Sequence, residues 1–263
     1  MAPFKEPHKA WTEFTLRPVY FKVASGEKLI VTATRRRSIS TPPILARDHD
    51  LAAGVAALAK QCKIMRAIHG RVGTPPLRDF SADFAGLAKI VTGQQLSAAS
   101  ASAIWARVSA AITPFEARSL LRMQDADLSA LGLSGAKIRT LMAIASAIDG
   151  EGLDIPALST APDAVVIERL TAIHCIGPWT ADIYLLFALR RADAFAAGDL
   201  ALQIAAQRHF NLKARPSPAA LVELAERWRP WRGVAARLLW ADYGAERQAA
   251  RSAAPRPRKS LEK

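Results

Sequence analysis

The sequence predicts a mostly α-helical protein with a basic surface. Beyond Asp48 the chain is a succession of stretches in which apolar residues recur with the three-to-four-residue period of a helix. Alanine is abundant in these stretches, and it has the highest helix propensity of all residues. Lys and Arg total 36 against 23 Asp and Glu, a formal net charge of +13 over 263 residues. These observations favour a helical fold whose partner is a polyanion.

Apolar spacing and helix breakers predict where the helices lie. The first is expected from Leu51 to about His69, before Gly73 and the Pro75-Pro76 pair. A second begins near Ser81, is interrupted at Gly93-Gln94-Gln95, and continues through Val108. The further predicted helices are Ala126–Leu131, Lys137–Ile148, Asp163–Ile173, Thr180–Leu189, Asp199–His209, Pro218–Trp228 and Pro230–Tyr243.

The two ends of the chain differ from this helical part. Thr15 to Ser40 is rich in β-forming residues around a Ser25-Gly26 turn signal, so it is either a β-hairpin or a flexible basic arm. Residues 247–263 are basic and lack apolar anchors, which predicts a disordered tail. We therefore expect residues 1–47 to form an N-terminal extension, 48–246 the helical domain, and 247–263 the tail.

Composition argues against several classes of protein. Two cysteines, Cys62 and Cys175, are too few for a four-cysteine zinc or iron–sulfur site, and they argue against a disulfide framework. No apolar run approaches the roughly 20 residues that span a bilayer. The first residues, MAPFKEPHKAW, lack the apolar core of a signal peptide. We expect a cytoplasmic protein with no membrane partner.

The stretch LTAIHCIGPWTADIYL, which runs from Leu170 to Leu185, predicts a tight helical hairpin. An apolar helix end meets Ile176-Gly177-Pro178, and a second helix begins at once. The unpaired backbone N–H groups at the start of that helix, together with its dipole, suit a DNA phosphate. Many helix pairs use such a turn for packing alone, so the pattern by itself leaves both interpretations open.

This segment resembles a known family. The run LTAIHCIGPWTADIYLLFAL, followed by ADAFAAGDLALQ, is similar to the hairpin and catalytic segment of the helix-hairpin-helix DNA glycosylases, and most of all to the bacterial DNA-3-methyladenine glycosylase II group. Three further blocks occur in the order found in that group, namely PPLRDFSADFAGLAKIVTGQQLSAASASAIW, LGLSGAKIRTLMAIA and ERWRPWRGVAARLLW. The resemblance covers roughly Asp48 to Tyr243 and implies a two-lobed helical helix-hairpin-helix glycosylase fold.

The resemblance also implies an activity. Such a protein flips a damaged base out of double-stranded DNA and hydrolyses its N-glycosidic bond, here for alkylated bases of the 3-methyladenine and 7-methylguanine type, in base excision repair. We expect it to act as a nucleoid-associated monomer without a cofactor and without side-chain metal ligands. In the family the hairpin often holds a monovalent cation through main-chain carbonyls.

Asp199, in the segment Ala197-Gly198-Asp199-Leu200, matches the catalytic aspartate of the family. A carboxylate beside the sugar can stabilise the positive charge that develops on the deoxyribose, and it can orient or deprotonate a water. Asp199 also fits as the N-cap of the helix that follows. The two roles are compatible.

The residue after Pro178 distinguishes two reaction types. Family members that also cut the strand carry a lysine two positions beyond the last glycine of the hairpin, where this chain has Trp179. Tryptophan cannot form a Schiff base. We therefore expect a monofunctional glycosylase that leaves an abasic site.

Trp179 and Trp231 match residues that line the base pocket in the resembling group. Aromatic faces attract bases that carry a positive charge after alkylation. A place in the core is the alternative for both, and it is where we assign Trp228 and Trp240. Where close relatives have a pocket tyrosine this chain has Ile183, which leaves the base preference open.

The remaining DNA contacts follow from the same resemblance. The Gln94-Gln95-Leu96 turn matches the loop that enters the minor groove and fills the gap left by the flipped nucleotide, although a buried pair of hydrogen-bonded glutamines is an alternative. The residues of the hairpin and of one neighbouring helix that we expect at the DNA backbone are Cys175, Ile176, Gly177, Thr180 and Lys137. Lys137 is otherwise a solvated residue of an amphipathic helix.

Cys175 departs from the family pattern, which has glycine at this position. A side chain there is strained if the backbone requires a positive φ, and it weakens the contact with the phosphate. A redox-sensitive thiol is an alternative role for it.

Two other functions remain compatible with the sequence. One is a glycosylase for another damaged base, such as a mismatched or oxidised one, against which the missing lysine and missing cluster cysteines argue. The other is a noncatalytic protein of the same fold that binds damaged DNA. Asp199 argues against it and Cys175 argues for it.

Overall fold

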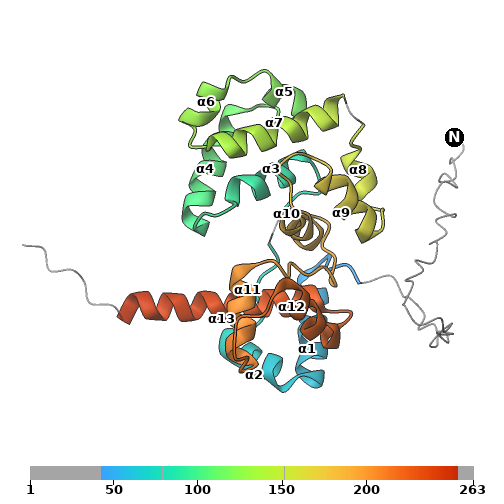
Figure 1. The fold of residues 1–263 in the computed structure, drawn as a ribbon, viewed down its shortest axis with the longest axis vertical. Helices are drawn as coiled ribbons and strands as arrows, with labels where there is room; N and C mark the ends of the chain where they lie inside the picture. Colours follow the sequence, from blue (N-terminus) through green and yellow to red (C-terminus); the bar gives the residue numbers. More distant parts are fainter. Residues whose placement is uncertain (1–42, 79, 151, 254–263) are drawn as a thin grey trace, which may run out of the picture. The chain divides into compact units, whose positions relative to one another are not determined.

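The helices that follow Asp48 form two groups joined by a central helical pair (Figure 1). The computed structural model describes residues 43–78, 80–150 and 152–253. Within these residues the fold is helical, with one isolated β-bridge between Ile44 and Arg191 and no strand. The predicted mostly α-helical fold is confirmed, while the Thr15–Ser40 segment lies outside the described residues.

The first group is built from both ends of the helical domain. The helices α1 (Asp48–Gln61) and α2 (Lys63–Val72) pack against each other and against α13 (Arg232–Ala253). Alongside them lie α11 (Leu200–His209) and α12 (Pro218–Ala225), the latter followed by a 3-10 turn at Glu226–Trp228. Trp228, which the sequence assigned to the core, is fully buried in this group.

The second group is continuous in sequence. It consists of α3 (Phe84–Gly93), α4 (Ala98–Ala111), α5 (Ala117–Leu121), α6 (Asp125–Ala130) and α7 (Gly135–Asp149), with α7 packing against α3, α5 and α6. The short helix α8 (Ile155–Leu158) follows. The helices α5 and α8 were not predicted, because four or five residues are too few to show a helical period.

The central pair consists of α9 (Asp163–Thr171) and α10 (Pro178–Ile183), which continues into a π-helix at Tyr184–Ala188. The α10 segment and the π-helix contact α3 of the second group. From Thr180 to Leu189 nearly every residue is buried, because this segment is covered by helices of both groups. It therefore forms the core on which the cavity described below is built.

The structure corrects two predicted boundaries. The single helix expected from Leu51 to His69 is two helices, separated at Cys62 by extended backbone with φ −137° and ψ 112°. The break changes the direction of the chain, so that the apolar residues Met65 and Ile68 of α2 are buried in addition to the apolar face of α1. At the other end, Arg247–Ala253 continue α13, where the sequence predicted the start of the disordered tail. Alanine and arginine propagate a helix at little cost once it is nucleated.

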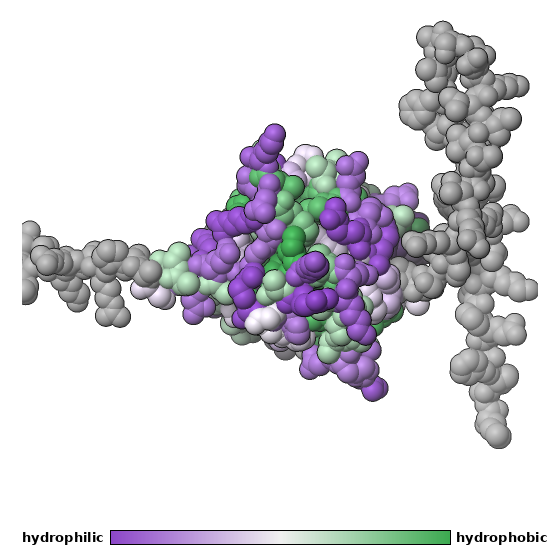
Figure 2. Space-filling view, turned by 90° about the horizontal axis from the view of Figure 1, so that it is seen from below, coloured by the Kyte–Doolittle hydropathy of each residue, from purple (hydrophilic) through white to green (hydrophobic). Residues whose placement is uncertain are grey.

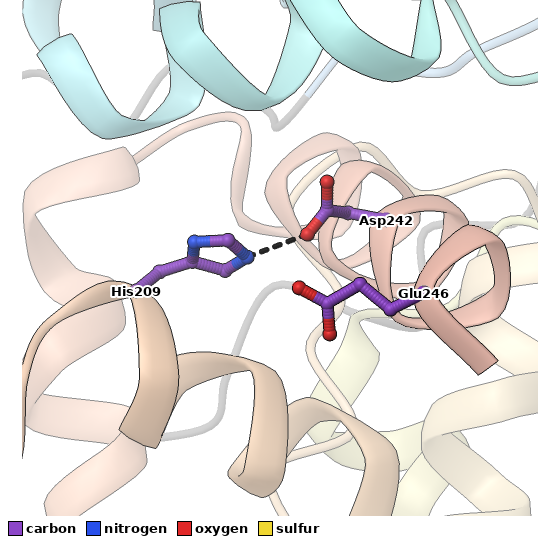
Figure 3. A group of neighbouring side chains, drawn as sticks. All are labelled: His209, Asp242 and Glu246. Atoms are coloured by element: carbon purple, nitrogen blue, oxygen red, sulfur yellow. Dashed lines mark hydrogen bonds and ion pairs between the residues drawn. The ribbon is translucent and has the colours of Figure 1, made fainter. Parts of the chain in front are cut away.

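A buried carboxylate ties three helices of the first group together. Asp242 on α13 is 2% exposed. Its Oδ1 accepts hydrogen bonds from Nε and Nη2 of Arg71 on α2, at 3.0 and 2.8 Å, and its Oδ2 lies 2.6 Å from Nε2 of His209 on α11 (Figure 3). Because a buried charge without a partner is costly, these contacts fix α2 and α11 against α13.

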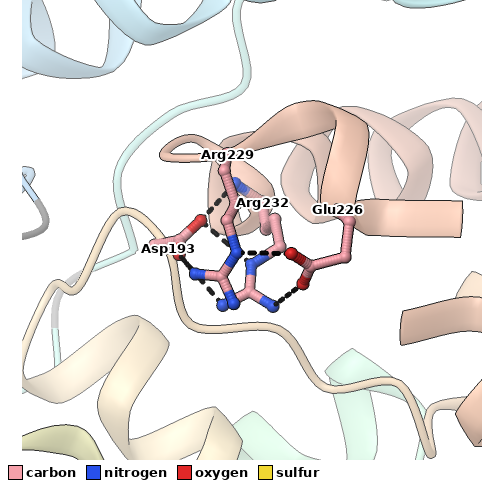
Figure 4. Close-up of polar contacts among 4 residues, drawn as sticks. All are labelled: Asp193, Glu226, Arg229 and Arg232. Atoms are coloured by element: carbon pink, nitrogen blue, oxygen red, sulfur yellow. Dashed lines mark hydrogen bonds and ion pairs between the residues drawn. The ribbon is translucent and has the colours of Figure 1, made fainter. Parts of the chain in front are cut away.

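A second buried carboxylate fixes the segment that leads to Asp199. Asp193 accepts hydrogen bonds from Arg229 and from Nε and Nη2 of Arg232, the latter two at 3.0 and 2.9 Å (Figure 4). Glu226 binds the same two arginines. The segment from residue 191 to 199 is thereby held against the start of α13.

The exposed surface mixes hydrophilic and hydrophobic side chains on the face seen from below in the orientation of Figure 1. The face in Figure 2 carries many hydrophilic side chains with hydrophobic ones between them. Among the large hydrophobic residues of the described part, the exposed ones are Ile44, Leu96, Leu200 and Val222. None of the helices described is long and apolar enough to cross a membrane.

Asp182 of α10 gives the fold a dependence on pH. Burial raises the pKa of its carboxyl to about 7, an effect that Arg232 opposes and Asp163 reinforces. Between pH 4 and 7 the unfolded chain loses this proton while the folded chain keeps it, so stability falls as the pH rises through this range. Above pH 7 both states are ionised and the loss is complete.

We expect Asp182→Asn to raise the free energy of unfolding at pH 8 by about 2 to 4 kcal/mol, and to leave it nearly unchanged at pH 4, because the amide removes the cost of ionisation. Urea unfolding of both proteins from pH 4 to 8 measures this difference. Glu223→Gln, which changes an exposed carboxylate of α12, is the matched control. A difference between Asp182→Asn and wild type that is the same at every pH would contradict the prediction.

Candidate active site

A cavity of about 480 Å³ opens beside Asp199. Its walls come from both groups of helices and from the central pair. Five aromatic rings line it, those of Phe80, Trp105, Trp179, Phe187 and Trp240. Among the described residues, the charged ones in its lining are Asp199, Arg78 and Lys89. The size and the largely aromatic lining suit a planar organic ligand of the size of a nucleobase.

Three N–H groups hold the half-buried carboxylate of Asp199. Its Oδ1 accepts from the backbone N–H of Leu202 at 3.0 Å, which makes Asp199 the N-cap of α11 as predicted. The same oxygen accepts from Nε1 of Trp240 at 2.9 Å. Its Oδ2 accepts from Nε1 of Trp179, also at 2.9 Å. Oδ2 thus has a single protein donor, and it keeps capacity to accept from a ligand or a water.

The structure separates the predicted pocket tryptophans. Trp179 lines the cavity. Trp231 does not. Its ring packs over Gly54 of α1, where a Cβ would lie 2.8 Å from the ring. Trp240, which the sequence assigned to the core, lines the cavity instead. The lining of the cavity thus includes Trp240 and not Trp231, because the start of α13 packs against α1 while Trp240, in the third turn of the helix, reaches Asp199.

Several residues of the cavity were not predicted from the sequence. Phe187 belongs to the π-helix, where the N–H of Leu189 donates to the carbonyl of Tyr184 five residues earlier. Its ring stacks on Trp240, with centroids 5.7 Å apart. Phe80 and Arg78 lie in the loop before α3. Periodicity does not reveal which loop residues face a cavity. The one signal in the sequence for Phe80 and Arg78 was their place in the PPLRDFSADF block, which resembles the family.

The hairpin between α9 and α10 exposes some of its predicted residues and buries others. Cys175 and Gly177 are exposed, whereas Ile176 and Thr180 are buried. The N–H of Ile176 already donates to the carbonyl of Ile173 at 3.1 Å. Burial keeps the side chains of Ile176 and Thr180 inside the protein, so the DNA contact that the sequence predicts for this hairpin remains one of its backbone. Cys175 adopts φ 66°, so the left-handed backbone expected for a glycine position is present.

The turn at Gln94-Gln95-Leu96 is attached to the hairpin by one of its glutamines. Nε2 of Gln94 donates to Oγ1 of Thr180 at 2.8 Å. Gln95 has φ 56° and is exposed, so the alternative of a buried glutamine pair is wrong. Leu96 is 39% exposed and lines the cavity. Gln95 and Leu96 are the residues of this turn that stand free to meet DNA.

Lys137 has a role within the fold. Its Nζ donates to the carbonyl of Thr92 at 2.8 Å, in the last turn of α3. A cation at this end of a helix also interacts favourably with the helix dipole. Partial burial lowers the pKa of Lys137. The geometry thus gives Lys137 a capping role where the sequence predicted a phosphate contact.

His209, Asp242 and Glu246 bring three potential metal ligands within 4.8 Å of one another (Figure 3). Arg71 is paired with Asp242, and Nη1 of Arg208 lies 2.5 Å from Oε2 of Glu246. Two guanidinium groups at this place oppose the binding of a cation. We therefore assign this cluster to the packing of α2, α11 and α13.

The family model that this helical fold matches describes a class of DNA repair proteins. The chain belongs to the HhH-GPD superfamily of base excision DNA repair proteins, whose family model matches residues 88–230. The family predicted from the sequence is thus confirmed.

Its relatives include DNA-3-methyladenine glycosylase 1 of Schizosaccharomyces pombe, which is 33% identical over 168 residues, covering 60% of this chain and 73% of that protein. The putative DNA-3-methyladenine glycosylase YfjP of Bacillus subtilis is 33% identical over 88 residues, and the match covers 34% of this chain and only 31% of YfjP. The structure of the fission yeast 3-methyladenine DNA glycosylase Mag1 in complex with abasic DNA superimposes with a TM-score of 0.66 and 27% identity, covering 72% of this chain and 95% of that one.

We expect Cys175→Gly to raise the free energy of unfolding by about 0.5 to 1 kcal/mol, because relief of the left-handed strain exceeds the entropy that glycine loses on folding. Chemical denaturation measures the change. Cys62→Gly, at a negative φ, is the matched control and should destabilise the protein. Equal destabilisation by both substitutions would show that Cys175 is not strained.

Proposed function

We propose that this protein is a DNA glycosylase that flips an alkylated base, of the 3-methyladenine or 7-methylguanine type, out of double-stranded DNA and hydrolyses its N-glycosidic bond. The observation that carries the proposal is the Asp199 carboxylate, held by two indole N–H groups at the wall of an aromatic cavity. The names of the relatives support the same activity. The biological role would be base excision repair, carried out by a monomer at the nucleoid.

The first step of DNA binding would be electrostatic attraction between the basic protein and the phosphates. The net charge of +13 attracts the phosphate backbone without regard to sequence. The exposed hairpin residues Cys175 and Gly177 offer their backbone to one phosphate. The exposed Gln95 and Leu96 can then fill the space left by the flipped nucleotide, because they border the cavity that receives it.

The flipped base would stack on the rings of Trp179 and Trp240. An alkylated base that carries positive charge is attracted to the electron-rich faces of these indoles. Since both indole N–H groups bind Asp199, ring orientation and carboxylate orientation are fixed together. The base and the carboxylate are thus placed on the same side of the cavity before reaction.

In the chemical step the bond between C1′ and the base nitrogen breaks, and the base leaves with the bonding electron pair. Positive charge develops on the deoxyribose, and the Asp199 carboxylate stabilises it. A water then attacks C1′, and Oδ2 of Asp199 accepts the proton that the water loses. The products are the free base and an abasic site.

We propose that the enzyme does not cut the strand. Trp179 stands where lyase members of the family carry a lysine, and an indole cannot form a Schiff base. Lys89 is a lysine of the cavity lining, and its Nζ lies 4.8 Å from the centroid of the Phe80 ring. Borohydride trapping on an abasic duplex tests for any lysine adduct, including one at Lys89.

Asp199→Asn should reduce the release of both alkylated bases from methylated duplex DNA by at least about 100-fold, because the transition state loses its compensating charge. Binding to the duplex should persist. Asp154→Asn changes another N-capping aspartate, at α8, and is the matched control. Wild type that binds DNA but releases neither base would favour a noncatalytic damaged-DNA-binding protein.

Trp240→Phe should lower the single-turnover rate of base release by about tenfold, since one hydrogen bond to a charged group contributes roughly 1.5 to 3 kcal/mol. The ring stacking on Phe187 remains in this variant. Trp231→Phe, which alters the tryptophan packed over Gly54, should leave the rate of release near that of wild type. Equal rates for Trp240→Phe and wild type would show that the indole N–H does not position Asp199.

A further inference from the structure

The wall of the cavity carries two cations in addition to the carboxylate. Arg78 and Lys89 both line it. The Arg78 guanidinium lies over the Phe187 ring, with its Cζ 5.1 Å from the centroid, and the Lys89 ammonium lies over the Phe80 ring. Because the wall carries two cations as well as aromatic rings, we expect the cavity to distinguish among positively charged bases by their hydrogen-bonding groups.

The Phe187 ring also makes a cation–π contact with a second guanidinium, that of Arg237. Cζ of Arg237 lies 4.5 Å from the same ring centroid. Arg237 is 4% exposed and donates from Nη2 to the carbonyl of Leu186, so it is a fixed part of the wall. The Phe187 ring therefore already interacts with two cations. Within the described residues no cation lies over Trp179 or Trp240, which leaves these rings available for the base.

Arg78 is suited to recognise an acceptor atom on the base. It lies in the loop before α3 and keeps an exposed surface, while partial burial lowers its pKa. A guanidinium presents five N–H donors and no acceptor. Among the described residues no carboxylate pairs with it, so its donors are open to a ligand in the cavity.

We propose that Arg78 donates a hydrogen bond to the carbonyl edge of the flipped purine, so that the enzyme favours guanine-type over adenine-type lesions. Guanine presents the acceptor O6 at this edge, whereas adenine presents the donor N6 amino group. An N–H donor matches the first and opposes the second. The inference rests on the proposed glycosylase activity, and it assigns to Arg78 a specificity that this activity alone does not require.

The test compares two bases released from the same methylated duplex DNA. The ratio of 7-methylguanine to 3-methyladenine released per unit time does not depend on the amount of protein or on its affinity for DNA. Both lesions carry the positive charge of alkylation, so this charge does not distinguish them. In Arg78→Met, which keeps an unbranched aliphatic stem but loses the donors, the ratio should fall about tenfold. That factor corresponds to about 1.4 kcal/mol.

Two further variants keep the test decisive. Arg78→Lys retains a donor and a charge but not the planar fork, so its ratio should lie between those of wild type and Arg78→Met. Arg215→Met removes one positive charge from an exposed loop residue away from the cavity, and its ratio should equal that of wild type.

A ratio unchanged in Arg78→Met would overturn the proposed specificity, even if both releases were slower. An Arg78→Met protein that loses its thermal transition would be replaced by Arg78→Leu, which also lacks donors and for which the same fall in the ratio is expected. If wild type releases neither base, the glycosylase activity itself is refuted. This result differs from an unchanged ratio and identifies which of the two proposals has failed.

Discussion

The carboxylate of Asp199 accepts hydrogen bonds from the indole N–H groups of Trp179 and Trp240, and the rest of the site is arranged around this clamp. Trp179 comes from the first turn of α10 and Trp240 from the middle of α13, so the clamp exists only when these helices meet. The backbone N–H of Leu202 adds a third donor. One carboxylate thus caps α11, fixes two aromatic residues of the cavity wall and supplies the candidate catalytic group.

Buried ion pairs hold the helices that this clamp requires. Asp193 and its two arginines fix the segment before Asp199 against the start of α13. Asp242 fixes α2 and α11 against the same helix. Because each of these carboxylates is almost fully buried, removing one partner would leave an uncompensated charge, which is the main cost of disrupting such a network. The position of α13, and with it that of Trp240, depends on charges some distance from the cavity.

The aromatic rings of the cavity differ in what they can bind. Phe187 and Phe80 already have cations over them, whereas none of the residues that the structure describes places a cation over Trp179 or Trp240. A base that enters therefore meets indole faces on one part of the wall and N–H donors of Arg78 on another. Attraction to alkylated bases in general and discrimination among them can arise from different residues.

The sequence by itself determined the helical class, the interruption after Gly93 and the N-cap at Asp199, because periodicity, breakers and caps are local properties. It also indicated the family, through the resemblance of four ordered blocks. The resemblance to the family indicated a glycine position at Cys175, and the structure has the left-handed backbone there, with φ 66°. The sequence could not decide which tryptophan of the Trp228 to Trp240 segment faces Asp199, or that Arg78 and Phe187 share a wall. Those facts depend on how α13 and the π-helix pack against distant helices, and packing between segments far apart in the chain leaves no period to detect.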